Sequence, residues 1–285
     1  MRGAEIVWRT LKGFSLLVIV TFFLFPIFWI FLMSFQTNET ILRTPPSIFF
    51  TPTLENYATL LSGHLETGSG VMTVDFMKNL MNSVILATSS VAIALILGVP
   101  AAYAFAYHRF RGSNSIAFTI LSFRFAPPLL VVLPLSLYFK AMGMTNTYIG
   151  TIWVYQLIAL PLIIWIVRSY FEDVSPDIEA SYRLDGHSWW SGFTRIALPL
   201  AGPGIAAAGL LSFIFCWNNF IFALVLTSGD KQPVTVGALA FITVSGIQYG
   251  QIAAAVVLSI LPTLALALYA QRWLVEGLSL GAVKG

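Results

Sequence analysis

A short charged stretch stands out against the rest of the sequence. Residues 176–186, PDIEASYRLDG, hold three acids and an arginine, whereas only 9% of the chain is charged and 58% is hydrophobic. One interpretation is a solvated linker in which Glu179 and Arg183, four residues apart on a helix, form an ion pair worth about 0.3–0.5 kcal/mol. The other is a charged surface that pairs with a second protein. The residue types alone leave both open.

The same stretch carries the start and stop signals of a short helix. Ser175 is a good N-cap, Pro176 suits the first helical position, and the acids that follow complement the helix dipole. Gly186 can adopt the left-handed conformation that ends a helix. The sequence therefore predicts a helix over 176–185, too short and too charged to cross a bilayer. A second start signal, Ser188, precedes two tryptophans that suit a membrane interface.

A few polar residues lie inside apolar runs and are candidates for a solute pathway. Arg124 costs about 2.5–3.5 kcal/mol at the centre of a membrane helix. It precedes Ala126-Pro127-Pro128, where a helix breaks and frees carbonyls, so it either satisfies those carbonyls or faces the pathway. Asn218 and Asn219 either bond neighbouring helices or, with Trp217, form a polar wall beside an aromatic platform along that pathway.

The sequence lacks the motifs of nucleotide binding, metal binding and catalysis. No Gly-x-x-x-x-Gly-Lys-Ser/Thr loop is present to cradle ATP phosphates. The three histidines are widely spaced and no His-Glu-x-x-His occurs, so no metal site and no catalytic constellation are predicted. The single cysteine, Cys216, lies in an apolar run and is expected to be buried. A net charge of +3, spread along the chain, does not indicate nucleic acid.

The hydropathy of the sequence predicts the membrane-spanning segments that hold these residues. The mean hydropathy is +0.84, which is typical of integral membrane proteins. Apolar runs long enough to span a bilayer occupy residues 13–34, 80–107, 115–139, 147–168, 196–226 and 248–271. The long segment 36–78 is expected to be an irregular outer loop with short helices. We divide the chain into an N-terminal part at 1–78, a transmembrane domain at 79–273 and a tail at 274–285.

The basic residues predict the orientation of these spans. If the N-terminus is cytoplasmic, that side receives ten of the fifteen lysines and arginines: Arg2, Arg9, Lys12, Arg109, Arg111, Arg168, Arg183, Arg195, Arg272 and Lys284. The other side receives four, Arg43, Lys78, Lys140 and Lys231, and Arg124 lies within a span. Both termini are therefore expected in the cytoplasm.

The charged stretch belongs to a longer pattern. Glu179-Ala180-Ser181 is followed by Asp185-Gly186 and then by Ile196, Leu198 and Pro199. This resembles the EAA loop of binding-protein-dependent ABC importer permeases, here over residues 172–199. Ser181 stands where the family pattern has alanine and keeps its small size.

The resemblance extends over most of the chain. It includes Thr53-Leu54-Glu55-Asn56-Tyr57, Asn82-Ser83, Ala101-Ala102-Tyr103-Ala104, Leu160-Pro161, Trp217-Asn218-Asn219-Phe220 and the closing Gly281-Ala282-Val283-Lys284-Gly285. These segments resemble the smaller permease of maltose-type and polyol-type importers.

The resemblance implies a fold and a set of partners. The expected fold is all-α, with six transmembrane helices and a cytoplasmic coupling helix, in the cytoplasmic membrane of a bacterium or archaeon. The expected partners are a second related permease, two ATPase subunits, an external substrate-binding protein, membrane lipid and a sugar or polyol. ATP and Mg would bind to the ATPase, and no cofactor to this chain. In the family the glutamate of the EAA loop pairs with a basic residue of the ATPase.

Other functions remain as alternatives. The nearest is an ABC permease for glycerol phosphate or an oligopeptide. A stand-alone secondary transporter would favour acids within the spans, whereas all twelve acids lie outside the apolar runs. An intramembrane enzyme would need a nucleophile and base or a metal in the spans.

The outer loop from Ser228 to Gly246 is a further candidate surface. It mixes turn-forming residues with the apolar run at 238–242, including Ala238, Leu239 and Phe241. Exposed apolar residues of this kind either bind a partner or pack on neighbouring helices. In maltose-type permeases the corresponding loop reaches into the binding protein, so the resemblance favours the partner.

The orientation is testable by cysteine labelling. Cysteines at Ser69 and Ser228 should react with an impermeant reagent added outside the cell, because both positions are expected in outer loops. Cysteines at Ser113 and Ser188 should react only after the membrane is opened. The opposite pattern would overturn the orientation and, with it, the cytoplasmic location of the charged stretch.

Overall fold

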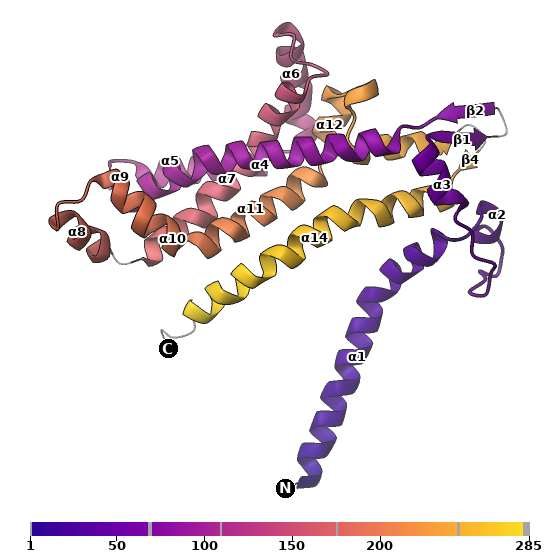
Figure 1. Cartoon of the computed structure of the whole chain (residues 1–285), viewed down its shortest axis with the longest axis horizontal. Coiled ribbons are helices and arrows are strands. Elements are labelled where there is room, and N and C mark those ends of the chain that lie inside the picture. The colour runs from indigo at the N-terminus through magenta and orange to yellow at the C-terminus, as the bar shows by residue number, and fades with distance from the viewer. Residues whose placement is uncertain (1, 68–69, 109, 175, 244–245, 282–285) are drawn as a thin grey trace. The chain divides into compact units, whose positions relative to one another are not determined.

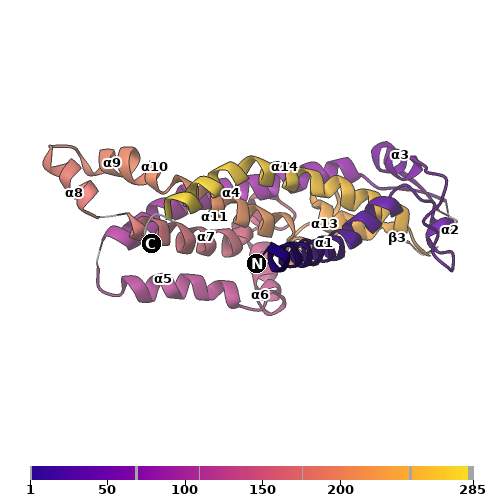
Figure 2. The same cartoon turned by 90° about the horizontal axis from the view of Figure 1, so that it is seen from below.

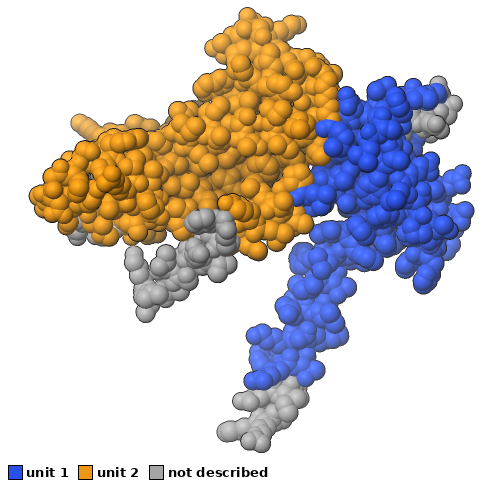
Figure 3. All heavy atoms as spheres, viewed as in Figure 1, with its two compact units in different colours: residues 1–77, 238–261 blue, residues 78–237, 262–285 orange. Residues whose placement is uncertain are grey.

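The computed structural model describes residues 2–67, 70–108, 110–174, 176–243 and 246–281. As the sequence predicts, the chain is mostly helical (Figure 1). It forms two compact units, which Figure 3 distinguishes by colour. Unit 1 comprises residues 1–77 and 238–261, and unit 2 comprises residues 78–237 and 262–285. The three-part division of the sequence at 78 and 273 stays a prediction.

Unit 1 combines one long helix with short surface elements. Its elements are α1 (Arg2–Met33), α2 (Asn38–Ile41), α3 (Glu55–Ser62), β1 (His64–Thr67), β2 (Gly70–Thr73), a 3-10 turn (Ala238–Phe241), β3 (Ile242–Thr243), β4 (Gly246–Ile247) and the first part of α14 (Tyr249–Gly281). The two hairpins are antiparallel, with His64 opposite Thr73 in the first and Ile242 opposite Ile247 in the second. The expected short helices are present in 36–78, and the hairpins are additions that the sequence did not predict.

One buried asparagine attaches α3 to the end of α1. The Asn56 amide donates to the carbonyls of Ser34 at 2.9 Å and Gln36 at 2.8 Å, just beyond the last residue of α1. The hydroxyls of Ser34 and Tyr57 lie 2.7 Å apart. Carbonyls at a helix end have no partner within the helix, so Asn56 satisfies groups that would otherwise be buried without one.

Unit 2 contains the remaining elements. They are α4 (Phe76–Tyr107, whose first two residues belong to unit 1), α5 (Ser113–Ser122), a 3-10 turn (Phe123–Phe125), α6 (Pro128–Ala141), α7 (Tyr148–Asp173), α8 (Pro176–Leu184), α9 (Trp189–Gly192), a π-helical turn (Phe193–Ala197), α10 (Leu198–Leu200), α11 (Gly202–Trp217), α12 (Ile221–Leu226), a 3-10 turn (Gly229–Lys231), α13 (Val234–Gly237) and the second part of α14.

The membrane spans follow the apolar runs, with two of them bent. Within the described residues, Trp8–Met33, Phe76–Tyr107, Tyr148–Asp173 and Tyr249–Gln271 are each long and apolar enough to cross a membrane. Two helix pairs meet the same criterion together, Ser113–Phe125 with Pro128–Ala141 at 95° and Trp189–Leu200 with Gly202–Trp217 at 71°. Six spans result if each pair counts as one. The break at Pro127-Pro128 confirms the prediction from the sequence, whereas the break at Gly202-Pro203 within 196–226 was not predicted; in both, proline lacks the N–H that a regular helix needs.

Helix α7 forms the centre of unit 2. Its residues Tyr155, Ile163 and Phe171 are all at most 1% exposed. Close approach of its neighbours depends on glycine: a Cβ at Gly98 of α4 would lie 2.9 Å from Ile163, and one at Gly204 of α11 would overlap the Tyr170 ring. Gln156 adds a polar link, donating to the Ser90 carbonyl of α4 at 3.1 Å. These contacts fix α4 and α11 against α7.

Candidate functional site

Helix α8 confirms the predicted short charged helix. It spans Pro176–Leu184, and Gly186 behind it has a φ of +89°, in the left-handed region as the sequence predicts. Leu184 is 87% exposed and Ile178 48% exposed, although both are apolar. Ser181 and Asp185 are also exposed. The expected cap Ser175 and the side chains of Glu179 and Ala180 lie outside the described parts.

An aromatic cluster anchors the segment that follows α8. The Tyr103 ring of α4 lies 4.8 Å from that of Phe193, 5.5 Å from that of Phe171 and 5.8 Å from that of Trp189, between ring centroids. Tyr103, Phe171 and Phe193 are buried. Such aromatic pairs contribute about 0.5–1.5 kcal/mol each beyond the burial of their area. The segment is thus held on Tyr103 near the end of α4, a ring that also packs on Phe171 of α7. In Figure 2 the helices α8 and α9 project beyond α7.

Within this segment the helices α8 and α9 are held together by polar and stacking contacts. The hydroxyls of Tyr182 and Ser191 lie 3.0 Å apart, and the Tyr182 ring stacks on His187 at 4.0 Å. As predicted, Ser188 caps α9, accepting from the Ser191 amide at 3.3 Å. Helix α8 is therefore tied to α9 through Tyr182.

The Ile196-x-Leu198-Pro199 part of the pattern coincides with a widened helical turn. Residues Phe193–Ala197 are π-helical, and the Leu198 amide bonds to the Phe193 carbonyl five residues earlier. Pro199 has no N–H to offer the preceding turn, which explains why the regular hydrogen-bond ladder is disturbed here. Ile196 and Leu198 are half-buried and Pro199 is exposed.

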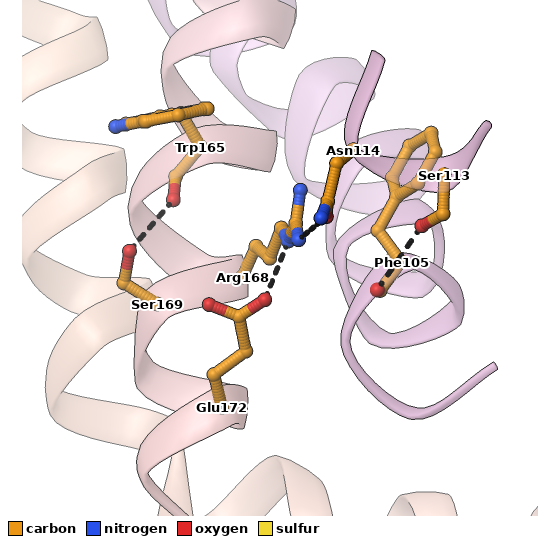
Figure 4. Close-up of polar contacts among 7 residues, drawn as sticks. All are labelled: Phe105, Ser113, Asn114, Trp165, Arg168, Ser169 and Glu172. Atoms are coloured by element: carbon orange, nitrogen blue, oxygen red, sulfur yellow. Dashed lines mark hydrogen bonds and ion pairs between the residues drawn. The ribbon is translucent and has the colours of Figure 1, made fainter. Parts of the chain in front are cut away.

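A second cluster lies where α7 ends and α5 begins (Figure 4). Arg168 of α7 forms an ion pair with Glu172 at 2.7 Å and also donates to the Asn114 side chain of α5. Ser113 donates to the Phe105 carbonyl at 3.4 Å. The spacing of Arg168 and Glu172 is visible in the sequence as an i,i+4 pair, whereas nothing in the sequence indicates Asn114 as their neighbour.

Arg124 donates to a backbone carbonyl in the structure. That carbonyl lies on α7, and not at the break at Ala126-Pro127-Pro128 that the sequence analysis considered. Its Nη1 donates to the Ile158 carbonyl of α7 at 3.0 Å, three residues before Pro161. Its guanidinium also lies 4.1 Å from the centre of the Phe215 ring, a cation–π contact. The side chain is partly exposed and lines a cavity of about 200 Å³ with Asn219 and Phe222. Both interpretations of Arg124 therefore retain a structural basis.

The other proposed pathway residues separate in the structure. Trp217 is 4% exposed and stacks on Phe213 at 5.5 Å, so it offers no open aromatic face in this conformation. Asn218 is exposed and donates to the Ile214 carbonyl of its own helix at 2.8 Å. Asn219 accepts from the Phe222 amide at 3.3 Å, starting α12, and lines the cavity beside Arg124. Of these three, only Asn219 shares a cavity with Arg124.

A buried asparagine near the start of α4 holds the segment 228–237. The Asn82 amide donates to the carbonyls of Asp230 at 3.0 Å and Gln232 at 2.9 Å, and its oxygen accepts from the Tyr148 hydroxyl at 2.6 Å. Ser83 accepts from the Val234 amide at 2.8 Å. Asn82-Ser83 entered the sequence analysis only as part of the resemblance. Two adjacent polar residues near the start of an apolar helix were the available signal.

The loop residues proposed to reach a binding protein differ in exposure. Phe241 is buried, so its place in that surface is corrected. Leu239 is 42% exposed and Ile242 is 56% exposed. An apolar ring in a loop can form the loop's own core. The sequence alone does not distinguish such a ring from one that contacts a partner protein.

No group of three metal-ligating side chains comes together within the described ranges. Cys216 is buried, as predicted. The chemistry available in these clusters is hydrogen bonding, ion pairing and apolar contact.

Comparison with known proteins identifies the family. Residues 94–279 match the family described as binding-protein-dependent transport system inner membrane component. The trehalose/maltose transport system permease protein MalG of Thermococcus litoralis is 33% identical over 99% of this chain and 99% of its own length. The trehalose transport system permease protein SugB of Mycobacterium tuberculosis is 33% identical over 94% of this chain and 95% of its own length.

A solved structure supports the fold. A chain of a bacterial ABC transporter involved in the import of the acidic polysaccharide alginate superposes with a TM-score of 0.74 at 23% identity, covering 94% of this chain and 97% of that chain. The chain belongs to the binding-protein-dependent inner-membrane components: it is a multi-pass permease subunit of an ABC importer, the transport component rather than a catalytic one.

Proposed function

We propose that this permease imports a sugar or polyol by alternating access, driven by two separate ATPase subunits that act on α8. A second, related permease completes the pathway, and an external binding protein delivers the solute. ATP and Mg bind to the ATPase subunits. Both termini lie in the cytoplasm, and membrane lipid surrounds the spans.

The observation that carries the coupling role is the exposure of α8. A short helix with acids, an arginine and two exposed apolar side chains, Ile178 and Leu184, has the mixed surface expected of a docking element. It is not a loose linker, because Tyr182 ties it to Ser191 of α9, and Trp189 and Phe193 pack on Tyr103 near the end of α4. A force on α8 therefore acts directly on the membrane helices.

The relatives support the proposed substrate class. Their names describe transport of trehalose and maltose, trehalose, and, for the permease NgcG of Streptomyces coelicolor, uptake of diacetylchitobiose. The cavity beside Arg124 and Asn219 supplies hydrogen-bond donors beside the Phe215 and Phe222 rings, a combination that suits sugar hydroxyls and ring faces. Ala238, Leu239 and Ile242 form the loop surface proposed to meet the binding protein.

Coupling through α8 is testable by two substitutions. Glu179→Lys reverses the charge expected to face a basic ATPase residue, and Gly186→Leu forces a side chain into a left-handed position at a cost of about 1–3 kcal/mol. Both should reduce ATPase co-purification with the tagged permease, or hydrolysis stimulated by binding protein, by about ten-fold. The matched control is Gly143→Leu, where φ is +68° in an outer connection and no atom lies within 4 Å of an added Cβ. Normal assembly and stimulation in both variants would make α8 a linker.

The substrate class is testable on the cognate binding protein. We expect maltose, trehalose, diacetylchitobiose or a polyol such as mannitol to raise its melting temperature, since a ligand at 100 times its Kd adds about 2.7 kcal/mol of stability. Stabilisation by glycerol 3-phosphate or an oligopeptide alone would reject the sugar assignment. Uptake of the stabilising solute should disappear when this permease is deleted.

Arg124→Met separates the two interpretations of that residue. Loss of a charge-assisted bond to the Ile158 carbonyl should lower the stability of the purified complex by about 1.5–3 kcal/mol, measured by thermal unfolding in detergent. Arg124→Lys keeps a donor and should retain most of that stability. Unchanged melting with lost uptake would instead assign Arg124 to the pathway.

A further inference from the structure

The joint between the α4–α5 turn and the end of α7 is hollow. A cavity of about 680 Å³ lies there, lined by residues 105–107, Phe110, residues 112–115, Arg168 and residues 171, 172 and 174. A tightly packed joint would hold the helices by apolar contact alone. Here polar side chains cross the joint instead, which makes their bonds important for its geometry.

Arg168 makes that crossing with its planar, forked guanidinium (Figure 4). Nε bonds to Glu172 on the same helix, and Nη2 donates to the Asn114 oxygen on α5. The Arg168 side chain is 13% exposed, whereas Glu172 is 46% exposed. The ion pair within α7 orients the guanidinium, and the remaining donors point to the first turn of α5. A lysine has no such fork and cannot hold both partners in this geometry.

A second arginine bonds the other end of the same helix to α7. At the end of α5, Arg124 donates to the Ile158 carbonyl of α7 at 3.0 Å. The pair Arg168–Asn114 and the pair Arg124–Ile158 therefore attach α5 to α7 at both of its ends, in opposite donor directions. Because α7 leads into α8 after only two residues, any displacement of α8 acts first on the α7 turn that contains Glu172.

We propose that Arg168 is a positioning residue for transport: with Asn114 it forms a latch that carries the movement of α8 to α5 and the broken α5–α6 span. The proposal rests on the coupling role of α8 proposed above. Without the latch, α7 still moves with α8 and the Arg124 bond still holds the far end of α5, but the part of α5 that contains Asn114 and Phe118 no longer follows. ATP hydrolysis and movement of α8 then continue while this part of α5 stays behind.

Spin-label distances in the complete transporter test this without knowledge of the substrate. One pair joins Leu184 of α8 to Leu211 of α11, and the other joins Phe118 of α5 to Leu211, in complexes with cysteines only at these positions. The trapping probe is MgATP with vanadate. In the otherwise unsubstituted complex both pairs should shift on trapping. In Arg168→Met and in Asn114→Ala the α8 pair should still shift, while the shifted fraction of the α5 pair falls about ten-fold, the size of a typical coupling between sites.

Two matched variants distinguish the latch from a general loss of structure. Asn114→Asp keeps the acceptor oxygen and should behave like the parent complex. Arg111→Met removes an exposed positive charge from the same inner turn and should leave both shifts intact. Full movement of α5 in both Arg168→Met and Asn114→Ala would overturn the latch, and so would a parallel loss of both shifts. If the α8 pair stays still even in the unsubstituted complex, the coupling role of α8 is wrong and the latch falls with it.

Discussion

A helix inside a bilayer must satisfy its backbone polar groups without water, and this requirement governs where the polar side chains of the permease lie. Each of the four long helices contains a proline, at Pro26, Pro100, Pro161 and Pro262. Two polar side chains in the spans donate to backbone carbonyls of another helix, Arg124 to Ile158 and Gln156 to Ser90. These two side chains therefore link neighbouring helices by hydrogen bonds.

The two ends of unit 2 are held by different kinds of force. At one end Asn82 and Ser83 hold the segment 228–237 by hydrogen bonds, which fix both distance and direction. At the other end Tyr103, Phe171 and Phe193 hold the segment after α8 mainly by aromatic burial. Apolar contacts depend little on direction, so that segment can shift while its rings stay covered. This difference is consistent with the coupling role proposed for α8.

The sequence was sufficient for the features that depend on local chemistry. The apolar runs predicted the spans because a bilayer demands about 20 apolar residues per helix. The helix at 176–184 and the left-handed Gly186 followed from capping and turn preferences, which act over a few residues. The family followed from the EAA pattern, since it fixes residue types over a defined spacing. Even the break at Pro127-Pro128 was readable, because a proline lacks the donor that a helix needs.

Only the tertiary structure decided which of these residues meet. One of the two interpretations of Arg124 had it satisfy the carbonyls of its own broken helix, yet it bonds to Ile158 of α7, 34 residues away in sequence. Asn82 reaches backbone groups 148 and 150 residues away, and Arg168 reaches Asn114 over 54. Phe241 and Trp217 turned out to be covered, although their types suited an exposed surface. Hydropathy and capping act along the chain, whereas a side chain's partner is set by which helices pack together, and this sequence carries no local record of that packing.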